Sequence, residues 1–140
     1  MNLFIDTTKP DRILLKFGSV KKIVRLTDNA ISTKLLLPNI VKIIEKQNKN
    51  FQNISGIAVV NGPGPFTSVR VGIVTANTLA LLLKIPIISI RSDRVDNFKD
   101  FILKAEKMLK NKKIGVSIVP YYGRPPHLTK SKKKRAKIIK

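Results

Sequence analysis

The feature that most constrains the fold is the regular succession of short apolar runs and longer amphipathic segments along the chain. Three short runs with the composition of β-strands come first, at 2–7, 12–17 and 20–26. Helix-like and strand-like segments then alternate: helices over 33–47, over 67–83 and from near 93, and strands over 54–60, 85–90 and 114–119. This order predicts an α/β fold in which a mixed sheet of five or six strands is flanked by helices.

Turn and cap residues refine this prediction. The pair Gly18-Ser19 between two β-rich runs is typical of a type II′ hairpin turn. Pro38 lies inside the first helical segment and is expected in its first turn or at a kink. The predicted N-caps are Thr67 or Ser68 for the second helix and Asp93 for the third.

Basic residues far outnumber acidic ones: the 140 residues carry 28 Lys and Arg against 8 Asp and Glu, for a net charge of +20. Residues 121–140 hold eight of the basic groups and no acid, so we expect a basic C-terminal tail at 120–140 behind a domain at 1–119. Such a charge attracts polyanions, and nucleic acid is the usual partner of a basic protein. A biased base composition of the coding sequence would give the same lysine-rich protein, and both explanations stay open.

Several classes of site are excluded by composition. The chain has no cysteine, which excludes a disulfide framework, a thiolate metal site and a cysteine nucleophile. Its single histidine, His127, excludes a site that needs two imidazoles and is expected to be an exposed bystander. The N-terminus reaches Asp6 too soon for a signal peptide, and the longest uncharged apolar stretch, 71–83, is short for a membrane span. We therefore expect a cytoplasmic protein with no membrane partner.

The segment 61–67 joins a predicted buried strand to a predicted helix, where α/β proteins often bind phosphate. Pro63 and Pro65 have no N–H to donate, and the Gly-Lys-Ser/Thr of a P-loop is absent. The pattern therefore favours a rigid turn. Anion contact, with Arg70 as the best candidate, is the alternative.

The second helical segment carries small residues four positions apart, at Gly72, Ala76 and Ala80. They lie on one face and allow another backbone to approach closely. The stripe predicts either packing on the protein's own sheet or a docking face for a partner helix, and the spacing does not decide between them.

Asp6, Thr7 and Thr8 follow the first predicted strand and are candidates for holding a metal or phosphate. A two-metal nuclease needs several converging carboxylates, and the chain has only eight acidic residues in all. A metal-dependent enzyme of the RNase H-like type is therefore the third of three functional hypotheses.

Residues 61–76, NGPGPFTSVRVGIVTA, resemble the signature of the TsaB family of tRNA threonylcarbamoyladenosine biosynthesis proteins, Gcp-like members of the actin-like ATPase superfamily. Shorter segments resemble other parts of the family: 3–8 its opening strand, 36–40 its first helix, 85–90 a later strand and 120–124 a motif near its C-terminus. The resemblance covers roughly 1–92 and 119–125. It implies a single actin-like (RNase H-like) half-domain, a Gcp-like N-terminal domain at 1–119, in a shortened member that lacks most of the family's second domain.

The resemblance also implies a function. Members of the family are similar in fold to TsaD, the catalytic subunit, and pair with it as non-catalytic scaffolds that support threonylcarbamoyl transfer to the adenosine 3′ of the anticodon (t6A modification). It implies a heterodimer with TsaD, TsaE as a further candidate partner, tRNA bound through the complex, and a homodimer when TsaD is absent. No cofactor of its own is expected, and a nucleotide at the interface with TsaD is left open. A stand-alone basic RNA-binding module on the same half-fold is the alternative.

The predicted site is a partner-binding face, with no catalytic or metal-binding residue. Carried onto this chain, the family's pairing face includes residues of the first two helices: Leu36, Ile40, Ile44, Phe66, Val69, Arg70, Gly72, Ile73, Ala76 and Ala80. The tail is predicted to bind tRNA through a cluster of cations: Lys130, Lys132, Lys133, Lys134 and Arg135.

The chain departs from the wider superfamily in ways that support a non-catalytic role. The TsaD metal site uses paired histidines, and this chain has only one histidine. The phosphate motif after the first strand normally contains a glycine that 6–8 lacks, so independent ATP hydrolysis is not expected. Ser68 stands where the family has glycine, and Asn77-Thr78 stand where it usually has Lys-Gly.

Overall fold

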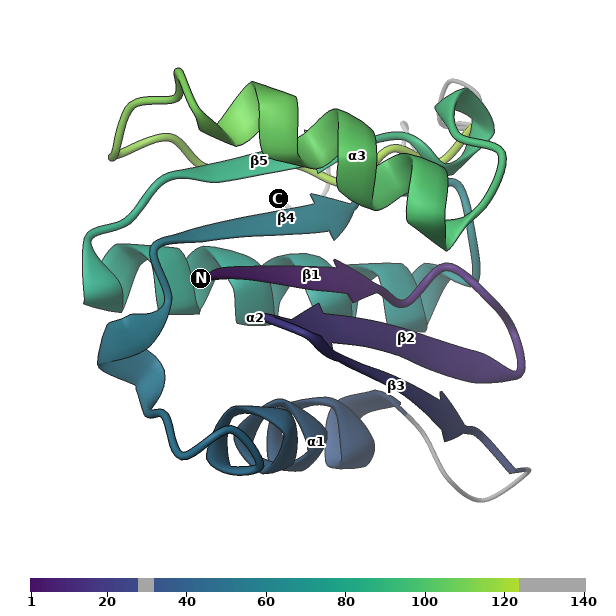
Figure 1. Cartoon of the computed structure of the whole chain (residues 1–140). Coiled ribbons are helices and arrows are strands. Elements are labelled where there is room, and N and C mark those ends of the chain that lie inside the picture. The colour runs from purple at the N-terminus through teal and green to yellow at the C-terminus, as the bar shows by residue number, and fades with distance from the viewer. Residues whose placement is uncertain (28–31, 124–140) are drawn as a thin grey trace, which may run out of the picture.

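The computed structural model describes residues 1–27 and 32–123. Five strands form one mixed sheet in the order β3-β2-β1-β4-β5 (Figure 1), with these bounds: β1 Asn2–Asp6, β2 Arg12–Phe17, β3 Val20–Arg25, β4 Gly56–Val60 and β5 Ile87–Ile90. β2 runs antiparallel to β1 and to β3, whereas β4 runs parallel to β1 and to β5. The predicted mixed α/β sheet is confirmed.

The hairpin between β2 and β3 turns at Gly18-Ser19. Of these two residues only Gly18 has a positive φ, of +59°. A type I′ turn needs positive φ at both central positions and type II′ only at the first, so the backbone agrees with the predicted type II′ turn.

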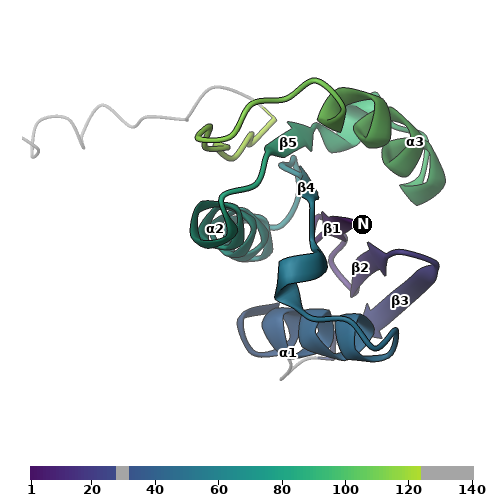
Figure 2. The same cartoon turned by 60° about the vertical axis from the view of Figure 1, so that its left-hand side comes forward.

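Three helices cover the sheet: α1 (Ser32–Glu45), α2 (Phe66–Leu83) and α3 (Phe98–Leu109). α1 packs on β2 and β3, and α2 packs beside it on β4, β1 and β5. α3 packs on the other face, over β5, β4 and β1 (Figure 2). Two short 3₁₀ helices, η1 (Phe51–Asn53) and η2 (Ser92–Arg94), connect these elements.

The strands separate two cores because successive side chains point to opposite faces. On β1, Leu3 and Ile5 belong to the larger core under α1 and α2, and Phe4 belongs to the smaller core under α3. Phe4 meets Phe101 of α3 edge to face, with ring centroids 6.1 Å apart. All five residues of β4 are buried, as expected for a central parallel strand with helices on both faces.

Both predicted N-caps are wrong, and one of the two placements predicted for Pro38 is excluded. Pro38 lies in the second turn of α1, which begins at Ser32, so it is not in the first turn, and a kink there stays a prediction. α2 begins at Phe66 with Pro65 as its N-cap and no side-chain cap, because the prolines fix the start of the helix before Thr67 and Ser68. α3 is capped by Asn97, whose side chain accepts a hydrogen bond from the Asp100 N–H at 2.9 Å.

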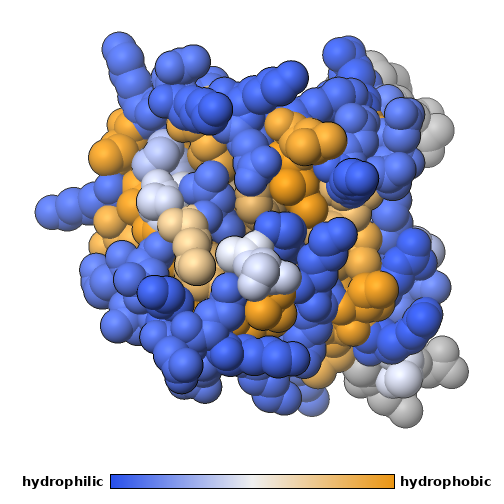
Figure 3. All heavy atoms as spheres, viewed as in Figure 1, coloured by the Kyte–Doolittle hydropathy of each residue, from blue (hydrophilic) through white to orange (hydrophobic). Residues whose placement is uncertain are grey.

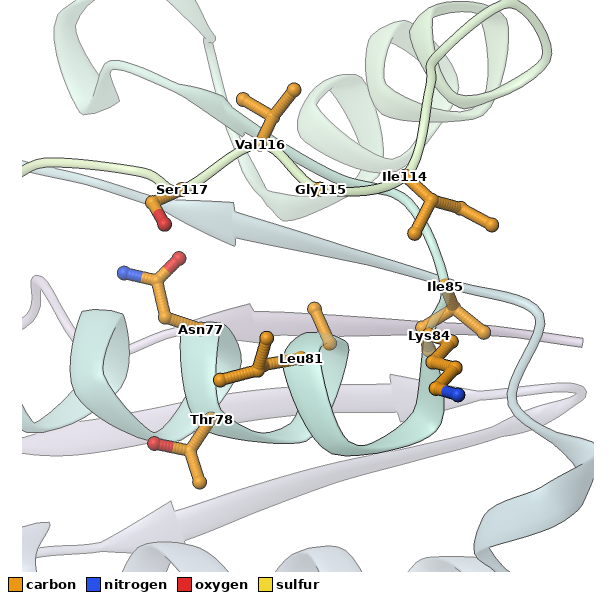
Figure 4. Close-up of a pocket in the computed structure, with 10 residues that line it drawn as sticks. Asn77, Thr78, Leu81, Lys84, Ile85, Ile114, Gly115, Val116 and Ser117 are labelled. Atoms are coloured by element: carbon orange, nitrogen blue, oxygen red, sulfur yellow. The ribbon is translucent and has the colours of Figure 1, made fainter.

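The predicted strand at 114–119 is also wrong. The backbone of Ile118 is hydrogen-bonded to the side chain of Asn77 on α2, which accepts from its N–H at 2.9 Å and donates to its carbonyl oxygen at 2.8 Å. Asn61 Nδ2 donates to the Val119 carbonyl oxygen at 3.0 Å. At Ile118 and Val119, asparagine side chains therefore bond the backbone in place of a neighbouring strand. It passes over α2 and encloses a pocket of about 300 Å³, toward which Asn77 projects (Figure 4).

Replacing Asn77 by alanine should therefore release the segment 114–123. The change leaves the N–H and C=O of Ile118 without partners, and we expect a loss of about 1–3 kcal/mol in unfolding free energy. Amide hydrogen exchange at Ile118 is the direct measurement. Thr78→Ala, at the exposed neighbouring position of the same helix, is the matched control and should leave that exchange rate unchanged.

α2 is the one helix in the described ranges that is long and apolar enough to cross a membrane by length and composition alone, and 28% of its 18 residues are buried. Its buried residues pack on the sheet: Val69, Gly72, Ile73, Ala76 and Ala80. The core helix of a soluble protein passes the same test. Packing on the sheet explains why the buried side of α2 is apolar, but it does not explain the exposed apolar residues of α2.

Candidate partner-binding site

The loop from Asn61 to Pro65 is a rigid turn held by backbone contacts. Ser92 donates from its N–H to the Gly62 carbonyl oxygen and from Oγ to the Pro63 carbonyl oxygen, both at 2.8 Å. Gly62 has a φ of +113°, precedes a cis proline, and lies so close to the Tyr121 carbonyl oxygen that a Cβ atom would collide with it. The carbonyl oxygens of Asn61, Gly62 and Pro63 thus accept hydrogen bonds from within the chain, and the two prolines have no N–H to offer, which together favour the predicted turn over a phosphate cradle.

The other glycines of the signature are explained by close approach to the end of β1. A Cβ atom on Gly64 would lie 2.7 Å from the Thr8 carbonyl oxygen, and one on Gly72 would collide with Thr7 Oγ1. Thr7 Oγ1 donates to the Ser68 carbonyl oxygen at 2.7 Å and so ties β1 to the first turn of α2. The structure therefore supports the first reading of the small-residue stripe, packing on the protein's own sheet.

Asp6 and Thr8 also serve this junction. Asp6 is buried, and its Oδ1 accepts hydrogen bonds from the Thr8 N–H at 2.8 Å and from Thr8 Oγ1 at 2.5 Å. No group of three or more His, Cys, Asp or Glu residues that could hold a metal ion occurs within 1–27 and 32–123. The hydrogen bonds between Asp6 and Thr8 stabilise a turn after β1, and they give no support to the nuclease hypothesis.

Most of the predicted partner face is interior. Its side chains point toward the sheet because the three- and four-residue spacing that identified them is the spacing of the core-facing stripe. Eight of the ten predicted residues are buried: Leu36, Ile40, Ile44, Val69, Gly72, Ile73, Ala76 and Ala80. The expectation that these eight form an exposed face is corrected here, and pairing with a partner stays a prediction.

The two remaining residues, Phe66 and Arg70, are exposed at the start of α2. Phe66 is 56% exposed, and its ring stacks on Tyr122 with centroids 5.0 Å apart. The guanidinium carbon of Arg70 lies 5.1 Å from the centroid of the Phe66 ring. The side chains of Arg70, Phe66 and Tyr122 thus form a stack, which we call the ladder, and it connects α2 to the segment after Val119.

An apolar groove of about 430 Å³ lies between α1 and α2, beside this ladder. Leu37 and Val74, which sequence reasoning missed, line it with exposed fractions of 46% and 62%. Each stands one position after a residue of the predicted face, on the same helix but on its exposed side. The remaining lining residues are Thr33, Phe66, Thr67, Arg70, Val71 and Thr75. We call this surface the α1–α2 groove.

A second ordered contact lies beyond the loop, at Arg91. Its guanidinium carbon lies 3.9 Å from the centroid of the Tyr121 ring, and it forms a two-point ion pair with Asp93 at 3.0 and 2.7 Å. The hydrogen bond between them raises the pKa of Arg91 and lowers the pKa of Asp93 below its ordinary value. Because the pair is exposed, its effect is to orient Arg91 against Tyr121.

The five tail residues predicted to bind tRNA, Lys130, Lys132, Lys133, Lys134 and Arg135, lie outside the described residues, as does His127. The boundary proposed at 119 is not tested. Tyr121 nevertheless belongs to the folded body, because its N–H donates to the Asn61 carbonyl oxygen at 2.8 Å.

Comparison with known proteins gives consistent results. A family model described as TsaD, tRNA N6-adenosine threonylcarbamoyltransferase, matches residues 30–101. Two curated relatives are both named tRNA threonylcarbamoyladenosine biosynthesis protein TsaB. The one from Buchnera aphidicola subsp. Schizaphis graminum is 32% identical over 118 residues, 83% of this chain and 53% of the relative. The one from Buchnera aphidicola subsp. Acyrthosiphon pisum is 38% identical over 58 residues, 41% of this chain and 26% of the relative.

Two solved structures share the fold. YeaZ from Pseudomonas aeruginosa has a TM-score of 0.56 and 23% identity, and the match covers 65% of this chain and 43% of that one. A second structure, of an uncharacterized protein with similarity to peptidase YEAZ from the same organism, has a TM-score of 0.54 and 22% identity over 65% and 44% of the two chains. The chain therefore spans about half, or less, of the length of the proteins it matches.

Proposed function

Because the chain belongs to the family described as TsaD, tRNA N6-adenosine threonylcarbamoyltransferase, and is TsaB-like within it, we propose that it is a non-catalytic scaffold subunit in tRNA threonylcarbamoyladenosine (t6A) biosynthesis. Its proposed partner is TsaD in a heterodimer, and its proposed location is the cytoplasm. TsaE, a nucleotide at the joint interface, and a homodimer in the absence of TsaD remain parts of this proposal.

The observation that carries the proposal is the α1–α2 groove. Exposed apolar side chains that gather in one place mark interaction surfaces, and Leu37, Phe66 and Val74 gather here from two helices. The groove is built by α2, the helix that carries the family signature. The signature thus both contributes to the core beneath the groove and includes two of its exposed apolar residues, Phe66 and Val74.

A non-catalytic role is supported by what the sequence supplies. The chain has one histidine and eight acidic residues in all, too few histidines for the paired-histidine metal site of TsaD. Asp6, the acid at the end of the central strand β1, is buried, and its Oδ1 accepts two hydrogen bonds from Thr8.

Size-exclusion chromatography with light scattering tests the proposal directly. The protein and the TsaD of its own organism, mixed at micromolar concentration, should elute together with the summed mass of the complex. Separate elution of both proteins would contradict the scaffold role. A stand-alone basic RNA-binding module would then be the better account of the +20 net charge.

The basic tail is proposed to contribute to tRNA binding. Deleting residues 128–140 removes seven of the 28 basic residues. Each tRNA phosphate that the tail no longer neutralises should lower the slope of log affinity against log salt by about one. We expect weaker tRNA binding and a flatter salt dependence in a filter-binding or fluorescence assay. Binding that is unchanged at every salt concentration would exclude a role for the tail.

A further inference from the structure

The β2–β3 hairpin has one face that no described helix buries. On its other face, toward α1, β2 buries Ile13, Leu15 and Phe17. α3 packs on β1, β4 and β5 and stops short of the hairpin, as Figure 2 shows. The side chains left on the uncovered face are half-buried or exposed: Arg12, Leu14, Lys16, Lys21, Ile23 and Arg25. We call this surface the open hairpin face.

The register of the hairpin places like charges directly opposite each other, twice. Arg12 pairs with Arg25 and Lys16 pairs with Lys21, with Leu14 opposite Ile23 between them. Side chains directly opposite each other in an antiparallel pair have Cβ atoms about 4.5–5.5 Å apart, and like charges there destabilise the pairing. The two like-charge pairs on the open hairpin face therefore destabilise the hairpin that carries them.

The described chain does little to neutralise these cations. Arg12 has an ion pair with its exposed neighbour Asp11 at 2.8 Å. Lys16 Nζ donates to the Gly18 carbonyl oxygen and lies 5.7 Å from the centroid of the Phe4 ring. For Lys16, Lys21 and Arg25, no carboxylate within residues 1–27 and 32–123 lies at ion-pairing distance. No carboxylate of the described residues therefore competes with an outside anion for these three cations.

We propose that the open hairpin face binds the phosphate backbone of RNA. Residues four apart on a strand are about 13 Å apart, so the face offers two pairs of cations at that separation on a stiff two-stranded ribbon. Arginine can hold a phosphate with two hydrogen bonds, and lysine holds it as a point charge. Leu14 and Ile23, between the pairs, are placed to contact sugars.

The choice of RNA among polyanions rests on the proposed function, whereas the arrangement of charges does not. A duplex RNA stem has a wide, shallow minor groove bordered by phosphates, which suits a flat ribbon and requires no sequence recognition. A membrane surface would call for a broader apolar area than Leu14 and Ile23 provide. Figure 3 shows mostly hydrophilic residues on the side of the molecule seen in Figure 1, with small hydrophobic areas between them.

Charge reversal on β3 separates binding from folding. In the double variant Lys21→Glu, Arg25→Glu, both like-charge pairs become opposite-charge pairs, so the melting temperature should rise or stay the same. Binding of an unmodified tRNA transcript in 0.1 M salt should weaken at least tenfold. The slope of log affinity against log salt should fall by about two. The control, Lys46→Glu with Lys49→Glu, makes the same change in net charge at two exposed positions at and beyond the end of α1, and should cost less than threefold.

Several outcomes would overturn this inference. Equal losses in the two double variants would mean that RNA responds only to net charge. Unchanged tRNA binding in the β3 variant, combined with lost binding to vesicles of anionic phospholipid, would assign the face to a membrane. Co-elution with TsaD is measured in parallel. A β3 variant that still binds TsaD but no longer binds tRNA supports the inference. A wild-type protein that does not bind TsaD but binds tRNA through this face contradicts only the proposed function.

Discussion

Replacing Gly72 by leucine should strongly destabilise the domain itself, beyond any effect on a partner contact. Gly72 is buried on the inner side of α2, and even a single Cβ atom there would collide with Thr7 Oγ1. Overpacking a well-packed site typically costs about 1–3 kcal/mol, occasionally more, and leucine adds four carbon atoms at a site with no room for the first. We expect a fall of more than about 10 °C in melting temperature, measured by thermal unfolding followed by circular dichroism.

The control for this prediction lies two residues further along the same helix. Val74 is 62% exposed, so Val74→Leu keeps the helix and adds volume toward solvent and the groove. It should change the melting temperature by less than about 2 °C, within the range typical of surface substitutions. A Gly72→Leu protein that melts like the wild type and fails to bind TsaD would show that the small-residue stripe is a docking face after all.

A double-mutant cycle locates the cause. Thr7→Ala removes the hydroxyl group that a Cβ atom on Gly72 would meet, together with the bond from Thr7 to the Ser68 carbonyl oxygen. Gly72→Ala in the Thr7→Ala background should therefore cost less than Gly72→Ala in the wild type. Equal costs would place the strain somewhere other than the junction of β1 and α2.

The sheet could be predicted from sequence because its signals are local. Alternation in β2, the continuous apolar run in β4 and the Gly18-Ser19 turn each report their structure within a few residues. The segment 114–119 was predicted wrongly for the same reason. Its composition is that of a strand, but its backbone partners are the side chains of Asn77 and Asn61, which are distant in sequence. Composition carries no information about such a partner.

The candidate site shows a different limit. The signature pointed to α2, and periodicity then selected the stripe of α2 that faces the sheet, because a core stripe and a docking stripe have the same spacing. α2 is apolar nearly all round, with Ile73 buried and the adjacent Val74 exposed, so the sequence does not show which side meets the sheet. The register between β2 and β3, in contrast, follows from the two-residue Gly18-Ser19 turn that the sequence predicts, and the like-charge pairs of the open hairpin face follow from that register.

Introducing a charge into the α1–α2 groove should abolish the complex with TsaD while leaving the domain folded. Leu37 and Val74 are 46% and 62% exposed, so aspartate at either position keeps its charge in water in the free protein. In a complex that covers the groove, the carboxylate would lose that water at a cost of several kcal/mol. In Val74→Asp, an ion pair with Arg70, four residues earlier on α2, would offset part of that cost, so we expect the larger effect from Leu37→Asp. A loss of about 3 kcal/mol is more than a hundredfold in affinity.

Light scattering on mixtures with TsaD, and a titration by isothermal calorimetry, measure this effect. Leu103→Asp is the matched control, because Leu103 is 52% exposed on α3, on the other face of the sheet. It should bind TsaD like the wild type, with a similar melting temperature in all three variants. If Leu37→Asp and Val74→Asp bind as well as Leu103→Asp, the groove is not the partner face. The exposed apolar residues at the C-terminal end of α2, Leu81 and Leu82, would then be the next surface to test, since they are the most exposed large apolar side chains on that helix.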